Sequence, residues 1–313
     1  MEGAYGVGKI VELVHPARFL FNAGATPKAW NRKMLDDPHF KVLAYEADSS
    51  KLFNNVDIKG GVAVTLRNTE QNYGAIGIFT AFDELNSLLR KVVHEAHFKS
   101  LSQIVVTRTA YRLTDKMHEE HPEAIGRLSQ GHPYDMSTNI FDRLPGVFFD
   151  RRPDDGCEYI QILGRQNNQR ISKYIRSEYV NQPDNLNKWK VFVPAANGSG
   201  ALGEVLSTPL IGQPLIGHTE SFISIGGFDT EKESEAAIKY VKTKFSRCML
   251  GVLKATQHNP PEKWVYVPLQ DFTTDSDIDW SQSVADIDRQ LYAKYGLDDE
   301  EIEFIESHVK EMD

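Results

Sequence analysis

Four residues in the first fifth of the chain have the side chains of a metal site that cleaves phosphodiesters. Asp57 and Lys59 are separated by one residue, and two further carboxylates, Glu46 and Asp48, precede them on neighbouring predicted β structure. Carboxylate oxygens are the ligands that Mg²⁺ prefers, and a nearby lysine can assist the attacking water. The pattern allows a magnesium-dependent nuclease that uses Asp57 and Lys59, although such short triplets also arise by chance.

Two other motifs with metal-binding or nucleotide-binding residue types favour structural roles. His118 and His121 are three residues apart, a spacing that does not point both rings at one ion from a helix, and Pro122 interrupts the segment. The glycines of residues 3–8 lack the preceding strand that a phosphate-binding loop requires. We therefore assign no metal ligand and no catalytic residue.

The charge of the chain is unevenly distributed. The 313 residues are 41% hydrophobic and 25% charged, which predicts a folded protein of about two domains. Residues 271–313 contain 14 acidic and three basic side chains, so they account for more than the whole net charge of −9. The rest of the chain is mildly basic, and the acidic total does not argue against a nucleic-acid partner.

Basic side chains are densest between residues 165 and 190, where only Glu178 and Asp184 oppose them. Such a run is either a solvated face or a surface that binds phosphate groups. Together with one later amide, the candidates for DNA contact are Arg165, Arg170, Lys173, Arg176, Lys188, Lys190 and Asn197.

The cysteines and the hydropathy pattern indicate the compartment. Cys157 and Cys248 lie far apart and do not form a Cys-x-x-Cys pair, so neither a disulfide framework nor a zinc cluster is predicted. No apolar run approaches the roughly 20 residues that span a bilayer, and the first residues are not those of a signal peptide. We expect a cytoplasmic protein with no membrane partner.

The first hundred residues predict short alternating strands and helices. Residues 10–21 are β-branched and aromatic and indicate a central strand that breaks at Pro16. The further elements are a helix over 27–36, strands over 41–46 and 61–66, a hairpin turn at 72–74 leading into a strand over 75–80, and a helix over 83–98. This order is typical of the edge of a doubly wound sheet that ends in an antiparallel hairpin.

The rest of the chain predicts a linker and then a β-rich module. Residues 101–146 are polar and rich in His, Pro and Gly, which favours a loosely packed linker. From residue 147, strand-sized segments alternate with Gly, Asn and Pro, and a capping box from Thr230 to Glu233 begins a helix over 231–256. Two helices are expected at 285–295 and 297–312. The predicted domains are therefore 1–100 and 147–313, joined by 101–146.

Residues 7 to about 80 resemble part of a known family in the order of their elements. The strand that ends at Pro16-Ala17, the helix after it, and the loop and strand from Lys51 to Val64 resemble the back half of the catalytic domain of γ-class adenine-specific DNA methyltransferases of restriction–modification systems. In that family an aromatic residue of this loop stacks against the flipped target adenine. The resemblance implies this role for Phe53, with a buried core phenylalanine as the alternative.

The later part of the chain resembles the target recognition domain of the same enzymes. Residues 189–198, residues 224–231 and the helix that follows carry this likeness. The resemblance implies an α/β fold class, with an incomplete Rossmann-like methyltransferase sheet followed by an α+β target recognition domain. It also implies double-stranded DNA as the partner.

The chain departs from the family at the two motifs that carry the methyl transfer. It has no glycine loop after a first strand, and its Asn259-Pro260-Pro261 is followed by Glu262 where the family has an aromatic residue. The resemblance thus implies S-adenosylmethionine for the intact family enzyme and no cofactor for this chain alone. We expect a C-terminal piece of a methyltransferase, which is either a truncated reading frame, one polypeptide of a split enzyme that works with an upstream methyltransferase polypeptide, or a separately made domain. The alternatives in function are a non-catalytic DNA- or protein-binding module and a Mg-dependent restriction nuclease.

Overall fold

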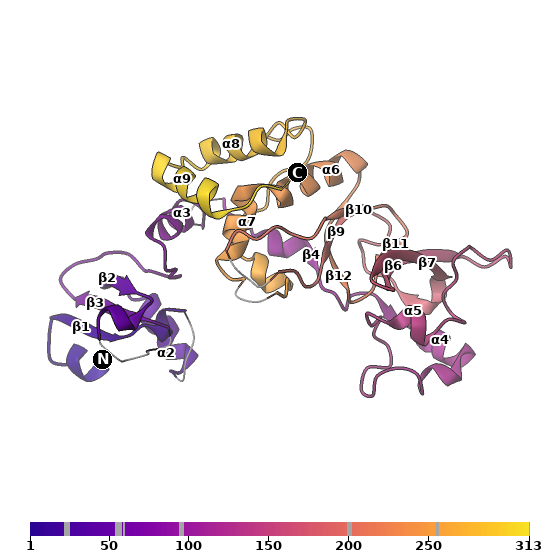
Figure 1. The fold of residues 1–313 in the computed structure, drawn as a ribbon, viewed down its shortest axis with the longest axis horizontal. Helices are drawn as coiled ribbons and strands as arrows, with labels where there is room; N and C mark the ends of the chain where they lie inside the picture. Colours follow the sequence, from indigo (N-terminus) through magenta and orange to yellow (C-terminus); the bar gives the residue numbers. More distant parts are fainter. Residues whose placement is uncertain are drawn as a thin grey trace. The chain divides into compact units, whose positions relative to one another are not determined.

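The computed structural model describes residues 1–21, 26–53, 58, 60–93, 97–198, 202–254 and 257–312. The chain divides into two compact units, Met1–Leu88 and Leu89–Asp313, and each is considered by itself (Figure 1). The described residues form a mixed α/β structure with several small sheets. None of the helices in these ranges has the length and apolar character needed to cross a membrane.

The first unit is built on a three-stranded antiparallel sheet. Its strands are β1 (Ile10–Pro16), β2 (Phe40–Glu46) and β3 (Val62–Asn68), and β3 lies between the other two. Short helices connect and cover them: α1 (Glu2–Tyr5), η1 (Arg18–Phe21), α2 (Lys28–Leu35) and η2 (Ser49–Lys51).

The core of the first unit lies on one face of this sheet. Phe19 of η1 packs edge-on against Trp30 of α2, with ring centroids 5.2 Å apart, and contacts Phe40 of β2 at 6.2 Å. On the edge strand β1, alternate side chains face solvent, and Ile10 and Val14 remain 61% and 59% exposed. The alternation is that expected of a sheet with one covered face.

This sheet differs from the predicted edge of a doubly wound sheet. All of its described pairings are antiparallel, whereas doubly wound sheets are mostly parallel. The predicted central strand over 10–21 is an edge strand that ends at Pro16, followed by η1. The predicted hairpin and strand after residue 72 are wrong: Gly74 and Gly77 have left-handed backbones (φ 79° and 63°) and the segment is irregular.

Two larger sheets form the centre of the second unit. The first has the order β10 (Leu210–Gly212), β9 (Trp189–Pro194), β12 (Phe222–Phe228) and β4 (Val105–Val106), and is antiparallel. The second has the order β11 (Ile216–His218), β6 (Tyr159–Gln166) and β7 (Gln169–Arg176). β11 is parallel to β6, and β6 and β7 form a hairpin. A small pair joins β5 (Arg112–Leu113) to β8 (Val180–Asn181).

A short crossing segment ties the two sheets together. Strand β10 belongs to one sheet and β11 to the other, and only residues 213–215 separate them. The turn needs a left-handed residue, and Leu215 supplies it with φ 63°. Lys190 of β9 donates hydrogen bonds to the carbonyls of Gln213 (3.2 Å) and Ile216 (3.0 Å) on either side of this turn. The lysine therefore fixes the point where the chain passes between the sheets.

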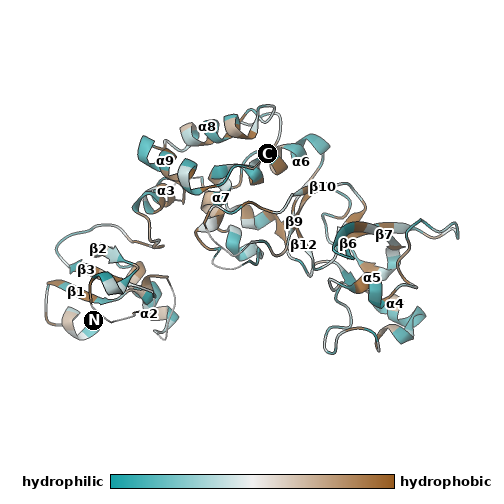
Figure 2. Cartoon of the chain, viewed as in Figure 1, coloured by the Kyte–Doolittle hydropathy of each residue, from teal (hydrophilic) through white to brown (hydrophobic). Residues whose placement is uncertain are grey.

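The helices of this part of the chain pack against these sheets and against one another. The longer ones are α3 (Asp83–Val93), which begins in the first unit, α6 (Glu231–Lys242), α7 (Lys244–Gly251), α8 (Val284–Lys294) and α9 (Asp299–His308). The shorter ones are η3 (Leu101–Ile104), α4 (Asp115–Glu120), η4 (Pro122–Ala124), α5 (Ile140–Arg143), η5 (Ser177–Tyr179) and η6 (Pro261–Trp264). In Figure 2 the strands β9 and β12 are apolar, whereas α9 is largely hydrophilic.

The single helix predicted over 231–256 is broken at Thr243. The capping box between Thr230 and Glu233 is present, as expected. Thr243 has an extended backbone (ψ 148°), and its hydroxyl accepts a hydrogen bond from the Ser246 amide. Asp288 of α8 accepts the amides of Lys244 and Phe245, both at 2.9 Å, so α7 starts from caps of its own.

The segment expected as a linker contributes to the core of the second unit. Met117 of α4, Met136 and Ile140 of α5 are each 0% exposed and pack in one cluster with Ile160 and Ile175 of the β6–β7 hairpin. Other apolar residues of this stretch, among them Leu113, Phe141 and Leu144, are buried in the same cluster. The segment is thus packed structure, and its polar composition reflects only its outer surface.

Candidate functional site

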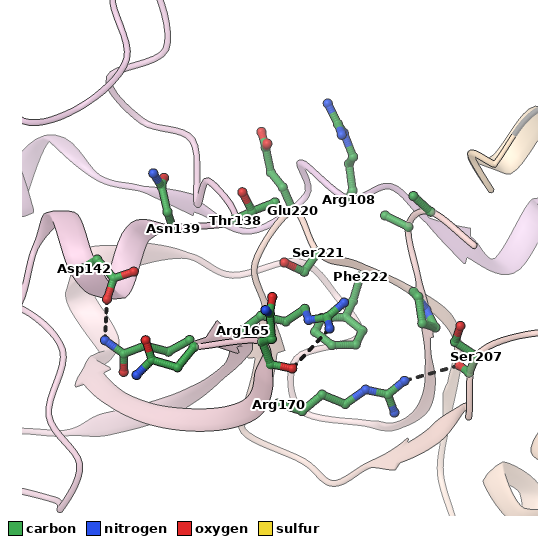
Figure 3. Close-up of a pocket in the computed structure, with 16 residues that line it drawn as sticks. Arg108, Thr138, Asn139, Asp142, Arg165, Arg170, Ser207, Glu220, Ser221 and Phe222 are labelled. Atoms are coloured by element: carbon green, nitrogen blue, oxygen red, sulfur yellow. Dashed lines mark hydrogen bonds between the residues drawn. The ribbon is translucent and has the colours of Figure 1, made fainter. Parts of the chain in front are cut away.

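A polar groove of about 540 Å³ opens at the turn end of the β6–β7 hairpin. One wall is the start of α5, another is the hairpin turn, and a third is formed by the end of β9 and the start of β12 (Figure 3). The lining residues are Arg108, Thr138, Asn139, Asp142, Arg165, Gln166, Asn167, Asn168, Arg170, Pro194, Ala195, Ala196, Ser207, Glu220, Ser221 and Phe222.

Arg165 and Arg170 lie side by side because strand pairing brings them together. They are direct cross-strand partners in the β6–β7 register, so their side chains project from the same face of the hairpin. Arg165 donates to the Asn168 carbonyl at 3.2 Å, and Arg170 donates to the carbonyls of Ser207 (3.3 Å) and Thr208 (2.6 Å). Figure 3 shows both guanidinium groups in the groove.

Arg108 reaches the same groove from a different part of the chain. Strand β4 runs antiparallel to β12 with Val106 opposite Ser224, so the chain just beyond β4 passes the start of β12. Arg108 is exposed and makes no hydrogen bond or ion pair with any residue in the described ranges. In Figure 3 it extends on the same side as Glu220, away from Arg165 and Arg170.

In the part of the chain that the structure describes, the groove has three arginines against two carboxylates, and its arginines are not held in ion pairs. Among the described residues, none of the three arginines forms an ion pair. Burial lowers the pKa of Arg170, and the charge of neighbouring Arg165 lowers it further. Two like charges on directly opposed strand positions repel each other, and an anion placed between them would relieve that repulsion.

Two carboxylates limit where an anion can bind. Asp142 of α5 accepts a hydrogen bond from Gln166 Nε2 at 2.5 Å, which holds it beside the hairpin turn. Glu220 lies at the mouth of the groove, next to Ser221. The remaining lining side chains are mostly hydroxyls and amides, which donate and accept hydrogen bonds. The arrangement suits a polyanionic ligand that also carries uncharged hydrogen-bond donors and acceptors.

Three other basic side chains of the predicted surface are occupied by carboxylates. Lys173 pairs with Asp150 at 3.0 Å, and Lys188 pairs with Asp229. Arg176 contacts three carboxylates: Glu120 at 3.1 Å, Asp155 at 3.4 Å and Glu178 at 3.8 Å. These ion pairs reduce the charge available to a ligand, so these residues are weaker candidates for DNA contact than the groove arginines.

Two residues predicted to contact DNA are buried, so the prediction is wrong for both. Lys190 is 0% exposed, and its ammonium donates to three carbonyls, those of Leu186, Gln213 and Ile216. Asn197 is 7% exposed, with its amide bonded to the Val205 carbonyl and its side-chain oxygen to the Ser207 amide, both at 2.6 Å. Neither side chain can reach DNA without unfolding its surroundings.

Phe53 is not a core residue. It follows η2, its side chain is 44% exposed, and its amide bonds to the Ser49 carbonyl at 2.9 Å. The alternative of a buried core phenylalanine is therefore wrong, and base stacking stays a prediction. Asp57 and Lys59, the residues of the nuclease alternative, lie outside the described residues.

The described carboxylates and histidines near the other motifs serve local structure. Glu46 accepts the Asp48 amide at 2.9 Å, and Asp48 accepts the amide and the hydroxyl of Ser50. His118 is only 9% exposed, and its Nε2 bonds to the Pro133 carbonyl at 2.7 Å. No cluster of three His, Cys, Asp or Glu suited to a metal ion occurs in the described part of the chain.

Sequence reasoning found two of the groove arginines and missed the other polar residues. Arg108 is isolated from the basic run, and only the pairing of β4 with β12 brings it into the groove. Asn167-Asn168 did carry a local signal, because two turn-forming residues between β-rich segments indicate a tight hairpin. Asn139 carried none, since it precedes a helix of four residues.

Comparison with known proteins gives little. No family profile matches the chain, and no curated protein matches it. Among solved structures, the chain is similar to the type IIG restriction endonuclease BpuSI, with 8% identity and a TM-score of 0.32. That match covers 89% of this chain and 42% of BpuSI, so the chain spans less than half the length of that protein. A TM-score of this size does not establish a common fold.

Proposed function

We propose that the chain is the DNA-recognition portion of a restriction–modification N6-adenine DNA methyltransferase and that it binds duplex DNA through the groove at the β6–β7 turn. The observation that carries the proposal is the presence of Arg108, Arg165 and Arg170 in one groove without carboxylate partners among the described residues. The adenine and methyltransferase parts rest on the sequence resemblance alone.

The chemistry of the groove fits a nucleic-acid backbone. Guanidinium groups bind phosphate oxygens in charge-assisted, often bidentate hydrogen bonds. Each phosphate neutralised releases counterions from the duplex, which makes binding depend on salt. Hydroxyl and amide side chains beside the arginines add the uncharged contacts to sugar, phosphate and base edges that such interfaces use.

The test compares two double variants that remove the same charge. Arg165→Ala/Arg170→Ala removes the opposed pair in the groove, and Arg151→Ala/Arg152→Ala removes two exposed arginines of the same unit that do not line it. Binding of a fluorescent duplex is followed by anisotropy over a range of salt concentrations. Circular dichroism checks that both variants remain folded.

We expect the groove variant to bind duplex DNA roughly 10- to 100-fold more weakly, with the salt slope reduced by about two. The control variant should keep most of the affinity and slope. Equal losses in both variants would mean that binding depends on the total charge of the protein and not on the groove. Unchanged affinity in the groove variant would remove the groove from the proposal.

The cofactor and base-stacking assignments are proposals of the same kind. S-adenosylmethionine would serve the intact family enzyme, and we expect no tight binding by this chain, because its sequence carries neither a glycine loop after a strand nor Asn-Pro-Pro-aromatic. Calorimetric detection of micromolar binding would contradict that. We assign Phe53 to stacking on a flipped adenine, which 2-aminopurine fluorescence in Phe53→Ala complexes would test.

A further inference from the structure

The turn of the β6–β7 hairpin carries four consecutive carboxamide side chains. Gln166 and Gln169 form the last cross-strand pair, and Asn167 and Asn168 make the two-residue loop between them. Arg165 and Arg170, the next pair down the hairpin, flank this group directly. Six polar side chains thus sit on this turn and the strand ends beside it, and all of them except Gln169 line the groove.

The backbone of this turn is well defined. Asn167 and Asn168 both adopt left-handed conformations, with φ 51° and 61°. Two consecutive left-handed residues are the geometry of a type I′ turn, which matches the twist of the flanking strands. The turn explains why asparagine is tolerated at both positions, since asparagine enters this region more readily than most residues. It does not require the glutamines on either side.

Most of these carboxamides are free. Asn167, Asn168 and Gln169 are exposed, and their side chains make no hydrogen bond to any residue within the described ranges. Gln166 is the exception, because its Nε2 donates to Asp142. The bond to Asp142, from α5, ties the base of the turn to a neighbouring helix and fixes where the turn points.

We infer that this hairpin turn is the element that reads DNA bases, resting on the proposed duplex binding at the same groove. Asparagine and glutamine form bidentate hydrogen bonds with N6 and N7 of adenine, and the major groove is wide enough to admit a two-stranded β-ribbon. Arg165 and Arg170, one residue further back on each strand, contact the phosphates at the groove edge. The preferred target contains adenine opposite Asn167 and Asn168.

A variant that keeps the turn separates base reading from folding. Asn167→Gly/Asn168→Gly removes both carboxamides, and glycine adopts left-handed backbone conformations without strain, so the hairpin stays intact. Wild type, this variant and Arg165→Ala/Arg170→Ala are each used to select duplexes from a pool with randomised positions. Direct binding constants are then measured for the selected duplexes and for single base-pair changes.

We expect the glycine variant to lose discrimination at two neighbouring A·T positions, by about tenfold for each base pair, so that it binds the preferred duplex about as weakly as wild type binds a duplex with both pairs changed. The salt slope should be nearly kept, because no phosphate contact is removed. The arginine variant should show the opposite result, with weaker binding to all sequences and the same base preference.

Three outcomes would overturn the inference. If wild type binds duplexes without sequence preference, or the glycine variant selects the same bases as strongly, the turn does not read bases while the proposed DNA binding stands. If wild type binds no duplex at all, the proposed function fails and the inference fails with it.

Discussion

The two ends of the β6–β7 hairpin bear similar arginines in opposite environments. At the open end, Arg176 is held by three carboxylates, whereas at the turn end Arg165 and Arg170 donate hydrogen bonds only to carbonyl oxygens among the described residues. All three arginines lie on the same pair of strands and within the same basic stretch of the sequence. The number of basic residues in a run therefore does not locate a binding surface; their carboxylate partners decide which charges are left for a ligand.

Lys190 is fully buried, and its ammonium group is held by backbone carbonyls. Of the substitutions considered, its replacement should reduce the stability of the fold most. Lys190→Ala would leave the three carbonyls of Leu186, Gln213 and Ile216 without their donor and open a cavity at the crossing segment. We expect a loss of about 3 kcal/mol in the free energy of unfolding, measured in urea. A loss comparable to that of Arg151→Ala would contradict the structural role of Lys190.

The same lysine predicts a pH dependence of stability. Burial lowers the pKa of Lys190 from 10.5 to about 7, so the folded state binds fewer protons than the unfolded state between these values. Stability should therefore rise with pH from 7 to 9, by up to about 1.4 kcal/mol per unit. Lys190→Met should remove this rise in urea titrations. A rise that survives in the variant must come from other groups.

Arg176→Ala sharpens the comparison between the two ends of the hairpin. Because the guanidinium is shared among Glu120, Asp155 and Glu178, we expect a melting temperature lower by a few degrees and unchanged duplex affinity. Arg165→Ala should give the reverse pattern. Differential scanning fluorimetry and anisotropy on the same preparations measure both properties. Equal loss of duplex affinity in the two variants would show that the two ends of the hairpin do not differ in DNA binding.

Glu220→Gln should give the smallest effect. The carboxylate at the mouth of the groove repels phosphate, and glutamine keeps its size while removing the charge. We expect duplex binding to tighten about twofold at low salt, with the gain disappearing at high salt. Weaker binding in the variant would instead indicate that Glu220 accepts a hydrogen bond from a base.

Local patterns predicted the elements whose determinants lie within a few residues. The capping box at Thr230 and Glu233 is present, and β2, β3 and α8 lie near their expected positions. The break at Thr243 could not be predicted from local sequence, because Asp288, 45 residues later, accepts two of the three amides that are capped at the start of α7. The strand predicted over 75–80 is absent because Gly74 and Gly77 adopt left-handed backbone conformations, which interrupt an extended chain.

The site was harder to predict than the fold, for reasons that lie in tertiary pairing. Lys190 in sequence is a basic residue on an alternating strand, and nothing local shows that a later turn buries it. Arg108 joins the groove only through the contact of β4 with β12. The density of basic residues predicted the region that contains the groove. Which of those residues lack an ion pair depends on the carboxylates that the fold places beside them.

The segment that links β10 to β11 has a mechanical consequence. Because it gives one strand to each sheet and Lys190 fastens it, the walls of the groove hold a set separation. Under the proposed duplex binding, the DNA would have to adjust to this fixed spacing, and the energy of distorting DNA varies with base sequence. Two duplexes that differ only in the flexibility of base-pair steps outside the contacted bases would then bind with different affinities.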